Sequence, residues 1–190
     1  PMPVLTGIKI EVDSNKITLI TTNREISVKV VLETVDNIEI VENGVCVVPG
    51  KYFIDIIKKL EGNTVEFTLF DSNTIKIISE RTTFTLISLD SANYPNINFD
   101  VNGTPMVIGS QKLKNFIRQT SFAAGVNESR MVLTGVCLDI NKKNLQMIAT
   151  DSYRLAKKID FLENEYSKTK IIIPSKSIEE LSKILEDESE

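Results

Sequence analysis

Three short patterns in the sequence carry side chains that could do covalent chemistry. Ser167-Lys168-Thr169-Lys170 has the Ser-x-x-Lys spacing in which a lysine activates a serine for acyl transfer. It lies in a polar stretch with no partner motif, so we interpret it as a solvated turn. Asp151-Ser152 could begin an aspartic-protease loop, but the glycine that closes such a loop is absent. Asp55 falls on the polar side of an expected helix, so we interpret it as a solvated side chain. Taken together, these patterns give catalysis little support.

The composition removes most of the remaining catalytic and metal chemistry. The sequence contains no histidine, which excludes Ser-His-Asp and Cys-His catalysis and the commonest transition-metal ligand. It also contains no glycine-rich phosphate loop. Cys46 and Cys137 each lie in an apolar run, which is typical of buried, reduced thiols rather than of a disulfide or a metal site. We therefore expect a protein that is not an enzyme and holds no cofactor or metal.

Length and charge indicate an ordinary globular protein. The chain has 190 residues, of which 42% are hydrophobic and 25% charged, and its formal net charge is -4. This bulk charge does not indicate a nucleic-acid binder, although a local basic face is compatible with it. The apolar runs are too short to span a bilayer, so we expect a cytoplasmic protein without a membrane partner. The start at Pro1 and the end in EDESE favour a piece of a longer protein.

One stretch, IATDSYRLA from Ile148 to Ala156, has the composition of an interaction surface. Tyr and Arg are frequent at binding hot spots, and here they follow a polar turn and are flanked by apolar residues. A second interpretation is a plain hairpin in which Tyr153 packs and Arg154 pairs with Asp151. On composition alone we favour the second interpretation.

The elements that position these residues follow from an internal repeat. The letters VLTG stand at Val4 to Gly7 and again at Val132 to Gly135, and apolar character matches at most inward positions downstream of both. A second block matches in the same order, with Val48-Pro49-Gly50-Lys51 over Ile173-Pro174-Ser175-Lys176. Two blocks in the same order at nearly equal spacing indicate one unit used twice.

Periodicity predicts an alternation of strands and helices. Strands are expected at 4–12, 16–21, 25–32, 44–48, 64–70, 74–79, 82–88, 106–109 and 170–173, with the strand pattern also recurring after the second VLTG. A helix is expected after Pro49, ending at Gly62. A second helix is expected over 111–124, with Ser110 as N-cap and with Phe116 and Phe122 on its apolar face. The last helix is expected over 175–185.

These blocks resemble a known family. GVNESRMVLTGVCLDI, MIATDSYRLAKK and IIIPSKSIEELSKIL resemble the middle domain of the bacterial DNA polymerase III beta subunit, the sliding-clamp family. VPGKYFIDIIKKL and SLDSANYPN resemble its first domain. The resemblance implies an α+β fold of repeated DNA-clamp domains, each with two helices packed against curved antiparallel sheets. It places domain one at 1–103, lacking its N-terminal strand and helix, and domain two at 104–190, lacking its C-terminal strands; domain three would be absent.

The resemblance also implies a function without catalysis. Two subunits would form a homodimeric ring around double-stranded DNA and tether the polymerase, independently of DNA sequence. Family positions for DNA contact map onto Lys51, Asn127, Met131 and Val132. Basic residues on the three expected helices suit the lining of the ring: Lys51, Lys58, Lys59, Lys112, Lys114, Arg118, Lys176 and Lys183. The alternative is that they are only the solvated sides of amphipathic helices.

Partners of the family, the polymerase alpha subunit and the clamp loader, dock short hydrophobic peptides. Carried over to this chain, one wall of the peptide pocket would comprise Leu133, Thr150, Ser152, Tyr153, Arg154 and Leu155. Ser152 and Tyr153 replace the usual Gly and His, and a serine accepts that turn less readily if it requires a positive φ. Arg81, Phe84 and Leu86 match the subunit interface. The alternative function is a stand-alone repeat protein acting as a peptide-binding adaptor without a DNA role, whose gene would not continue into a third unit.

Overall fold

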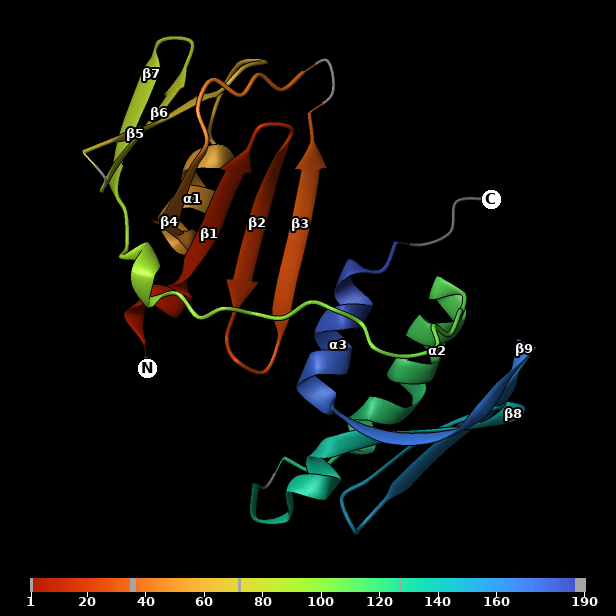
Figure 1. Ribbon diagram of the computed structural model, residues 1–190. Coiled ribbons are helices and arrows are strands. Elements are labelled where there is room, and N and C mark those ends of the chain that lie inside the picture. The colour runs from red at the N-terminus through yellow and green to blue at the C-terminus, as the bar shows by residue number, and fades with distance from the viewer. Residues whose placement is uncertain (1, 35–36, 72, 127, 187–190) are drawn as a thin grey trace. The chain divides into compact units, whose positions relative to one another are not determined.

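The computed structural model describes residues 2–34, 37–71, 73–126 and 128–186. The chain divides into two compact units, Pro1–Asp100 and Val101–Glu190. Each unit combines helices with antiparallel strands, as Figure 1 shows, so the α+β class predicted from the sequence is confirmed. None of the helices found over these residues is long and apolar enough to cross a bilayer.

The first unit begins with a four-stranded antiparallel sheet. A 3₁₀ turn, Pro3–Thr6, leads into β1 (Gly7–Asp13), β2 (Lys16–Thr22), β3 (Ser27–Glu33) and β4 (Gly44–Pro49), in the order β3-β2-β1-β4. The strand predicted from Val4 therefore starts three residues late, because the residues before Gly7 form the turn. β3 is an edge strand, and all seven of its residues are exposed.

Helix α1 (Gly50–Ile57) follows β4 directly. Pro49 has a φ of -60°, and the buried Gly50 allows close approach, since a Cβ there would lie 2.9 Å from the carbonyl oxygen of Thr6. The helix packs the buried Phe53 against Val48, Ile75 and Ile77. The predicted end at Gly62 was wrong: the helix is capped at Lys58, and Gly62, with a φ of 110°, belongs to the loop that follows.

A second sheet completes the first unit. β5 (Glu66–Phe70), β6 (Thr74–Ser79) and β7 (Thr82–Ile87) pair in the order β5-β6-β7, which leaves β7 at an edge. A 3₁₀ turn at Ser91–Asn93 is capped by the Asp90 carboxylate, and the buried Tyr94 donates its hydroxyl to the carbonyl oxygen of Ile20 at 3.0 Å. This last contact fixes the end of the unit to its first sheet.

The second unit places two helices against two long strands, as Figure 1 shows. Its elements are α2 (Ser110–Thr120), 3₁₀ turns at Ser121–Ala123 and Glu128–Thr134, β8 (Gly135–Thr150), β9 (Leu155–Pro174) and α3 (Ser175–Ile184). Phe116, Ile117 and Ile178 of the helices share a core with Val136, Leu138, Leu145 and Met147 of β8. The core thus forms between the helices and one side of the strands.

Two details of this unit differ from prediction. The strand expected at 106–109 is not formed; Met106 and Ile108 instead pack their side chains against the core from an irregular segment. Ser110 is the first helical residue of α2 rather than its N-cap, and Gly109 occupies the cap without a side-chain hydrogen bond. The apolar alternation at 106–109 therefore reflected packing of side chains, not pairing of backbone.

The mutual register of β8 and β9 breaks between Ile140 and Asn144. Residues 141–144 are exposed, and Lys142 has a φ of 55°. Buried positions are even-numbered before this break and odd-numbered after it, from Val136 to Ile140 and from Leu145 to Ala149. The break corresponds in the repeat to the Asp13–Lys16 turn that joins β1 to β2 in the first unit.

The predicted repeat appears as the same backbone construction in both units. Gly7 pairs with Pro49, and Gly135 pairs with Pro174. The threonine of each VLTG donates its hydroxyl to a carbonyl oxygen three residues before it, at 2.7 Å in the first unit and 2.8 Å in the second. A Cβ on Gly7 would lie 2.5 Å from Val47 Cγ1, and one on Gly135 would lie 2.5 Å from Ile172 Cγ2. Each VLTG therefore forms a 3₁₀ turn followed by a closely packed glycine.

Candidate functional site

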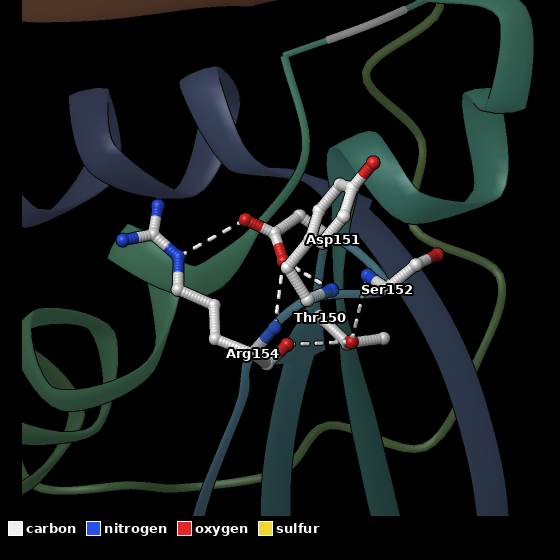
Figure 2. A network of polar contacts seen from close by, with 5 residues as sticks. Thr150, Asp151, Ser152 and Arg154 are labelled. Atoms are coloured by element: carbon white, nitrogen blue, oxygen red, sulfur yellow. Dashed lines mark hydrogen bonds and ion pairs between the residues drawn. The ribbon is translucent and has the colours of Figure 1, made fainter.

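The turn that joins β8 to β9 is organised by the Asp151 carboxylate. Thr150 and Leu155 are the last pair of the two strands. Asp151 Oδ1 accepts hydrogen bonds from the backbone N–H groups of Tyr153 at 3.0 Å and Arg154 at 2.9 Å, and Oδ2 accepts from Arg154 Nε at 3.0 Å, as Figure 2 shows for Arg154. One side chain therefore fixes the backbone of the turn and the Arg154 side chain together.

Thr150 closes the other side of the same turn. Its hydroxyl donates to the carbonyl oxygen of Arg154 at 2.7 Å and accepts from the backbone N–H of Ser152 at 3.2 Å (Figure 2). With the Asp151 bonds, these contacts satisfy much of the backbone of Ser152, Tyr153 and Arg154 from within the turn. The turn is therefore rigid although its side chains are exposed.

The electrostatics of the turn favour the charged carboxylate. The pKa of Asp151 lies below its ordinary value, chiefly because the backbone N–H of Arg154 donates to the carboxylate, then because that of Tyr153 does, with the Arg154 charge adding to both. Asp151 is therefore ionised at neutral pH, and the network of Figure 2 is intact under physiological conditions.

The turn presents apolar side chains to solvent. Tyr153 is 98% exposed and Leu155 is 65% exposed. Leu133 lies close to the turn, because its carbonyl oxygen accepts from Gly125 N at 2.7 Å and a Cβ on Gly125 would lie 3.7 Å from both Leu133 Cβ and Asp151 Cβ. Of the two interpretations of this stretch, the Arg154–Asp151 pair of the second is present, but its packed Tyr153 is wrong.

Two further contacts surround the turn. Ser152 has a φ of 79°, the left-handed conformation that a glycine adopts without strain, and its Oγ accepts from Arg130 Nη1 at 3.1 Å. The Arg154 guanidinium lies over the ring of Phe122, with 5.6 Å between Cζ and the ring centroid. The sequence predicted Phe122 on the apolar face of a helix, but it belongs to the 3₁₀ turn after α2 and is 57% exposed.

Two domain models of one known protein family match this chain. The model of the DNA polymerase III beta subunit, N-terminal domain, matches residues 1–98, and the model of its central domain matches residues 107–190. The chain belongs to the DNA polymerase III beta subunit family. The two matches follow each other in the chain, with consecutive domains of the family over the two compact units.

Individual members of this family agree with the assignment. A "Beta sliding clamp" of Staphylococcus epidermidis is 39% identical over 193 residues, which cover 100% of this chain and 51% of that protein. The structure of the DNA polymerase sliding clamp from Bacillus subtilis has a TM-score of 0.92 at 34% identity and covers 100% of this chain and 51% of its own. The structure of the DNA polymerase III beta chain from Streptococcus pneumoniae has a TM-score of 0.93 at 33% identity and covers 98% of this chain and 50% of its own. The chain spans about half the length of the curated relatives it matches.

The basic residues expected to contact DNA lie on or beside all three helices of this beta-subunit chain. Lys51, Lys58, Arg118 and Lys176 are exposed, and Arg118 also donates to Asn115 Oδ1 at 3.1 Å. Lys112 differs, because its Nζ donates to the carbonyl oxygen of Phe161 at 2.8 Å and lies 3.5 Å from Asp160 Oδ2. Four of these five cations are thus directed to solvent, whereas Lys112 is bound to its own sheet.

The remaining positions expected at DNA have a different character. Met131 and Val132 are 79% and 61% exposed, in the segment that leads to β8. Asn127 lies outside the described residues. Apolar side chains cannot pair with phosphates, so the two described positions can contribute shape but not charge.

The predicted subunit-interface residues lie on edge strand β7 and the turn before it. Arg81 is exposed in that turn. Phe84 and Leu86 are half-buried and, together with Tyr52, Asp55, Ile56 and Lys59 of the α1 segment, line a shallow groove of about 300 Å³. Tyr52 and Ile56 were not predicted here from the sequence, because the resemblance supplied interface positions on the strand alone.

The patterns considered for covalent chemistry are dispersed in the structure. Ser167 and Lys170 both belong to β9 rather than to a turn, and Lys170 Nζ lies 4.0 Å from Asp139 Oδ2. Cys46 and Cys137 are free and half-buried, and burial raises the pKa of the Cys46 thiol. Across the described residues, no three His, Cys, Asp or Glu side chains converge as metal ligands. The rigid, exposed turn at Thr150–Leu155 is suited to non-covalent capture of a partner.

Proposed function

We propose that the full-length protein is a sliding clamp, a non-catalytic subunit of the bacterial replicase. Two subunits form a ring around duplex DNA in the cytoplasm and tether the polymerase for processive synthesis. The observation that carries this proposal is the match of two consecutive clamp domains to the two compact units of the chain. Tethering acts through effective concentration, since a polymerase held to a ring cannot diffuse from the template.

The Thr150–Leu155 turn is the proposed docking site for replication partners. Extended hydrophobic peptides from the polymerase alpha subunit and the clamp loader bind against Leu133, Thr150, Ser152, Tyr153, Arg154 and Leu155. Three features support this role: the turn is rigid, Tyr153 and Leu155 are exposed, and the Arg154 side chain is fixed between Asp151 and Phe122. A preformed surface of this kind loses little conformational entropy on binding.

The helices supply the proposed contacts to DNA. Lys51, Lys58, Arg118 and Lys176 attract phosphates without regard to base sequence. Their exposure supports this role, and the contacts of Lys112 with Asp160 and Phe161 make it a weaker contributor. Asn127, Met131 and Val132 complete the proposed DNA surface.

The β7 edge is the proposed subunit interface. Arg81, Phe84 and Leu86 face a partner subunit there and, with Tyr52 and Ile56 of α1, provide an apolar groove for it. An edge strand carries backbone groups available for pairing, which suits extension of a sheet across two subunits.

Peptide capture is tested by fluorescence anisotropy on the full-length protein. A labelled Gln-Leu-Ala-Leu-Phe peptide is titrated with the unaltered protein, with the Arg154→Ala, Leu155→Ala variant and with an Ile159→Ala control. Ile159 is an exposed apolar residue of β9 outside the turn. We expect saturable binding that disappears in the double variant and persists in the control. Equal binding by all three proteins would remove the turn from the site.

The ring is tested by DNA topology. The protein is loaded on nicked circular DNA, and its retention is compared before and after the circle is cut. Loss on cutting is expected, since a ring leaves a linear duplex through its ends, whereas unchanged retention would contradict encirclement. A peptide-binding adaptor without a DNA role would bind peptide in the first experiment and show no retention in this one; the comparisons do not favour it.

A further inference from the structure

Ser152 occupies a backbone conformation that is unfavourable for serine. Its φ of 79° lies in the left-handed region, where a side chain crowds the following carbonyl. A glycine would adopt the same turn without this cost. The Thr150 and Asp151 bonds that shape the turn do not use the Ser152 side chain, so the fold of the turn gives no reason for a hydroxyl there.

The hydroxyl instead contacts a segment that is distant in the chain. Ser152 Oγ accepts from Arg130 Nη1 at 3.1 Å, across 22 residues. Arg130 interrupts the 3₁₀ turn of Glu128–Thr134 with non-helical angles, φ -129° and ψ 70°. It directly precedes the exposed Met131 and Val132, whereas Ser152 directly precedes the exposed Tyr153. The bond therefore joins two exposed apolar segments at their starts.

The contact also orients a donor group. A guanidinium carries five N–H groups in a fixed fork, and Ser152 receives one of them through Nη1. A long side chain held at one nitrogen loses less entropy when it makes a second bond. An extended peptide presents backbone carbonyl oxygens that need such donors.

We propose that Ser152 is a positioning residue that holds Arg130 at the edge of the partner site, where the guanidinium donates to a backbone carbonyl of the bound peptide. Arg130 is then a specificity-determining contact that selects an extended backbone beside the apolar anchors. The inference rests on the proposed peptide site. The contact with Arg130 explains why a strained serine at position 152 is compatible with peptide binding, because its hydroxyl provides a hydrogen bond that glycine lacks.

The test is a double-mutant cycle in the full-length protein. The affinity for the Gln-Leu-Ala-Leu-Phe peptide is measured for Ser152→Ala, Arg130→Ala and the double variant, with Ser152→Gly beside them. Ser152→Ala is expected to weaken binding about three- to tenfold, the range of one hydrogen bond. The same substitution in the Arg130→Ala background is expected to change the affinity less than twofold.

The glycine variant separates positioning from simple stability. Ser152→Gly removes the hydroxyl and the strain together, so its Tm is expected to exceed that of Ser152→Ala while its peptide affinity falls by the same factor. Losses that multiply in the double variant, or unchanged affinity in Ser152→Gly, would overturn the inference while leaving the peptide site standing. Absence of peptide binding by the unaltered protein would overturn the proposed site and this inference with it.

Discussion

Asp151 determines the local structure of the Thr150–Leu155 turn, the proposed partner site. Its carboxylate accepts two backbone N–H groups and the Arg154 Nε, so a single substitution disturbs three contacts at once. The sequence indicated the Arg154–Asp151 pair, because an aspartate three residues before an arginine across a polar turn favours it. The exposure of Tyr153 could not be predicted, since it depends on whether a segment distant in the chain covers the ring.

The pH dependence of peptide binding should report on this carboxylate. The pKa of Asp151 is lowered in the folded turn, so its stabilising contribution is present above the unfolded value and disappears as pH falls through the lowered one. Peptide affinity should therefore stay constant from pH 8 to about 5 and decline only below about pH 4, the ordinary aspartate range. The peptide used carries no titrating side chain, and anisotropy titrations at each pH measure the effect.

An Asp151→Asn variant provides the comparison for this pH profile. The amide can still accept a backbone N–H but cannot pair as an anion with Arg154, so we expect about three- to tenfold weaker binding at pH 7, the value of one charge-assisted bond. Asp160→Asn, on β9 and paired with Lys112, is the matched control. Equal affinity of the Asp151 variant and the unaltered protein would contradict this role for the carboxylate.

Phe122 should contribute to peptide affinity through its contact with the Arg154 guanidinium. A cation above an exposed aromatic ring contributes about 0.5–1 kcal/mol, so Phe122→Leu should weaken peptide binding about two- to fivefold while the protein stays folded. Phe161→Leu, at an exposed phenylalanine of the same unit, should leave the affinity unchanged. Isothermal titration with the peptide measures both, and an equal reduction in the two variants would indicate a general effect on the unit.

At the scale of elements, the two VLTG turns explain the repeated sequence. Threonine closes the 3₁₀ turn and glycine admits the neighbouring strand, so both residue types are required where the geometry recurs. Periodicity predicted the alternating strands of the first unit and its central helix, because those signals are local. It misplaced the end of α1 and the start of β1, since both depend on caps and close contacts.

Strand predictions in the second unit were less accurate for a related reason. The segment at 106–109 has strand-like alternation, but Met106 and Ile108 contribute side chains to the core without a strand beside them. Alternation reports which side chains are buried, and the pairing of backbone depends on a partner strand that the local sequence does not reveal. The same limit applies to the proposed peptide site, where Arg130 and Phe122 reach the turn from other segments.

Gly135→Ala should destabilise the second unit. The added Cβ would lie 2.5 Å from Ile172 Cγ2 and 2.9 Å from the carbonyl oxygen of Ile173, so the strands must separate locally, at a cost of about 1–3 kcal/mol. Gly44→Ala is the matched control, because a Cβ there meets nothing within 4 Å. Urea denaturation followed by circular dichroism compares the two, and equal midpoints would show that β8 and β9 accommodate the methyl group.

At the scale of the whole molecule, the proposed binding to DNA would depend on cations distributed over several elements rather than on one site. The net charge of -4 opposes approach to DNA, so local exposed lysines must overcome it. The sequence predicted basic residues on the helices but could not distinguish a solvent-directed lysine from one bound to its own sheet. Lys112 is the clear example, because its partners Asp160 and Phe161 are far from it in sequence.

Salt dependence should separate these lysines. The logarithm of DNA affinity falls linearly with the logarithm of salt concentration, and each lysine that neutralises one phosphate adds about 0.9 to that slope. Lys176→Met should therefore make the slope for duplex DNA shallower by about one. Lys112→Met should change the slope by much less than one and should lower thermal stability instead. Binding titrations of full-length protein at several salt concentrations measure both, and a larger slope change for Lys112 would contradict the assignment.

The exposed edge strand β3 has a practical consequence for anyone preparing this polypeptide. Val28, Val30, Val31 and Leu32 are all exposed, β3 pairs with β2 on one side, and its charged residues are only Lys29 and Glu33. Such a strand is a template for edge-to-edge pairing between molecules. Preparations should therefore become turbid as concentration rises, and buffers that screen charge or strengthen apolar burial should lower the concentration at which this begins.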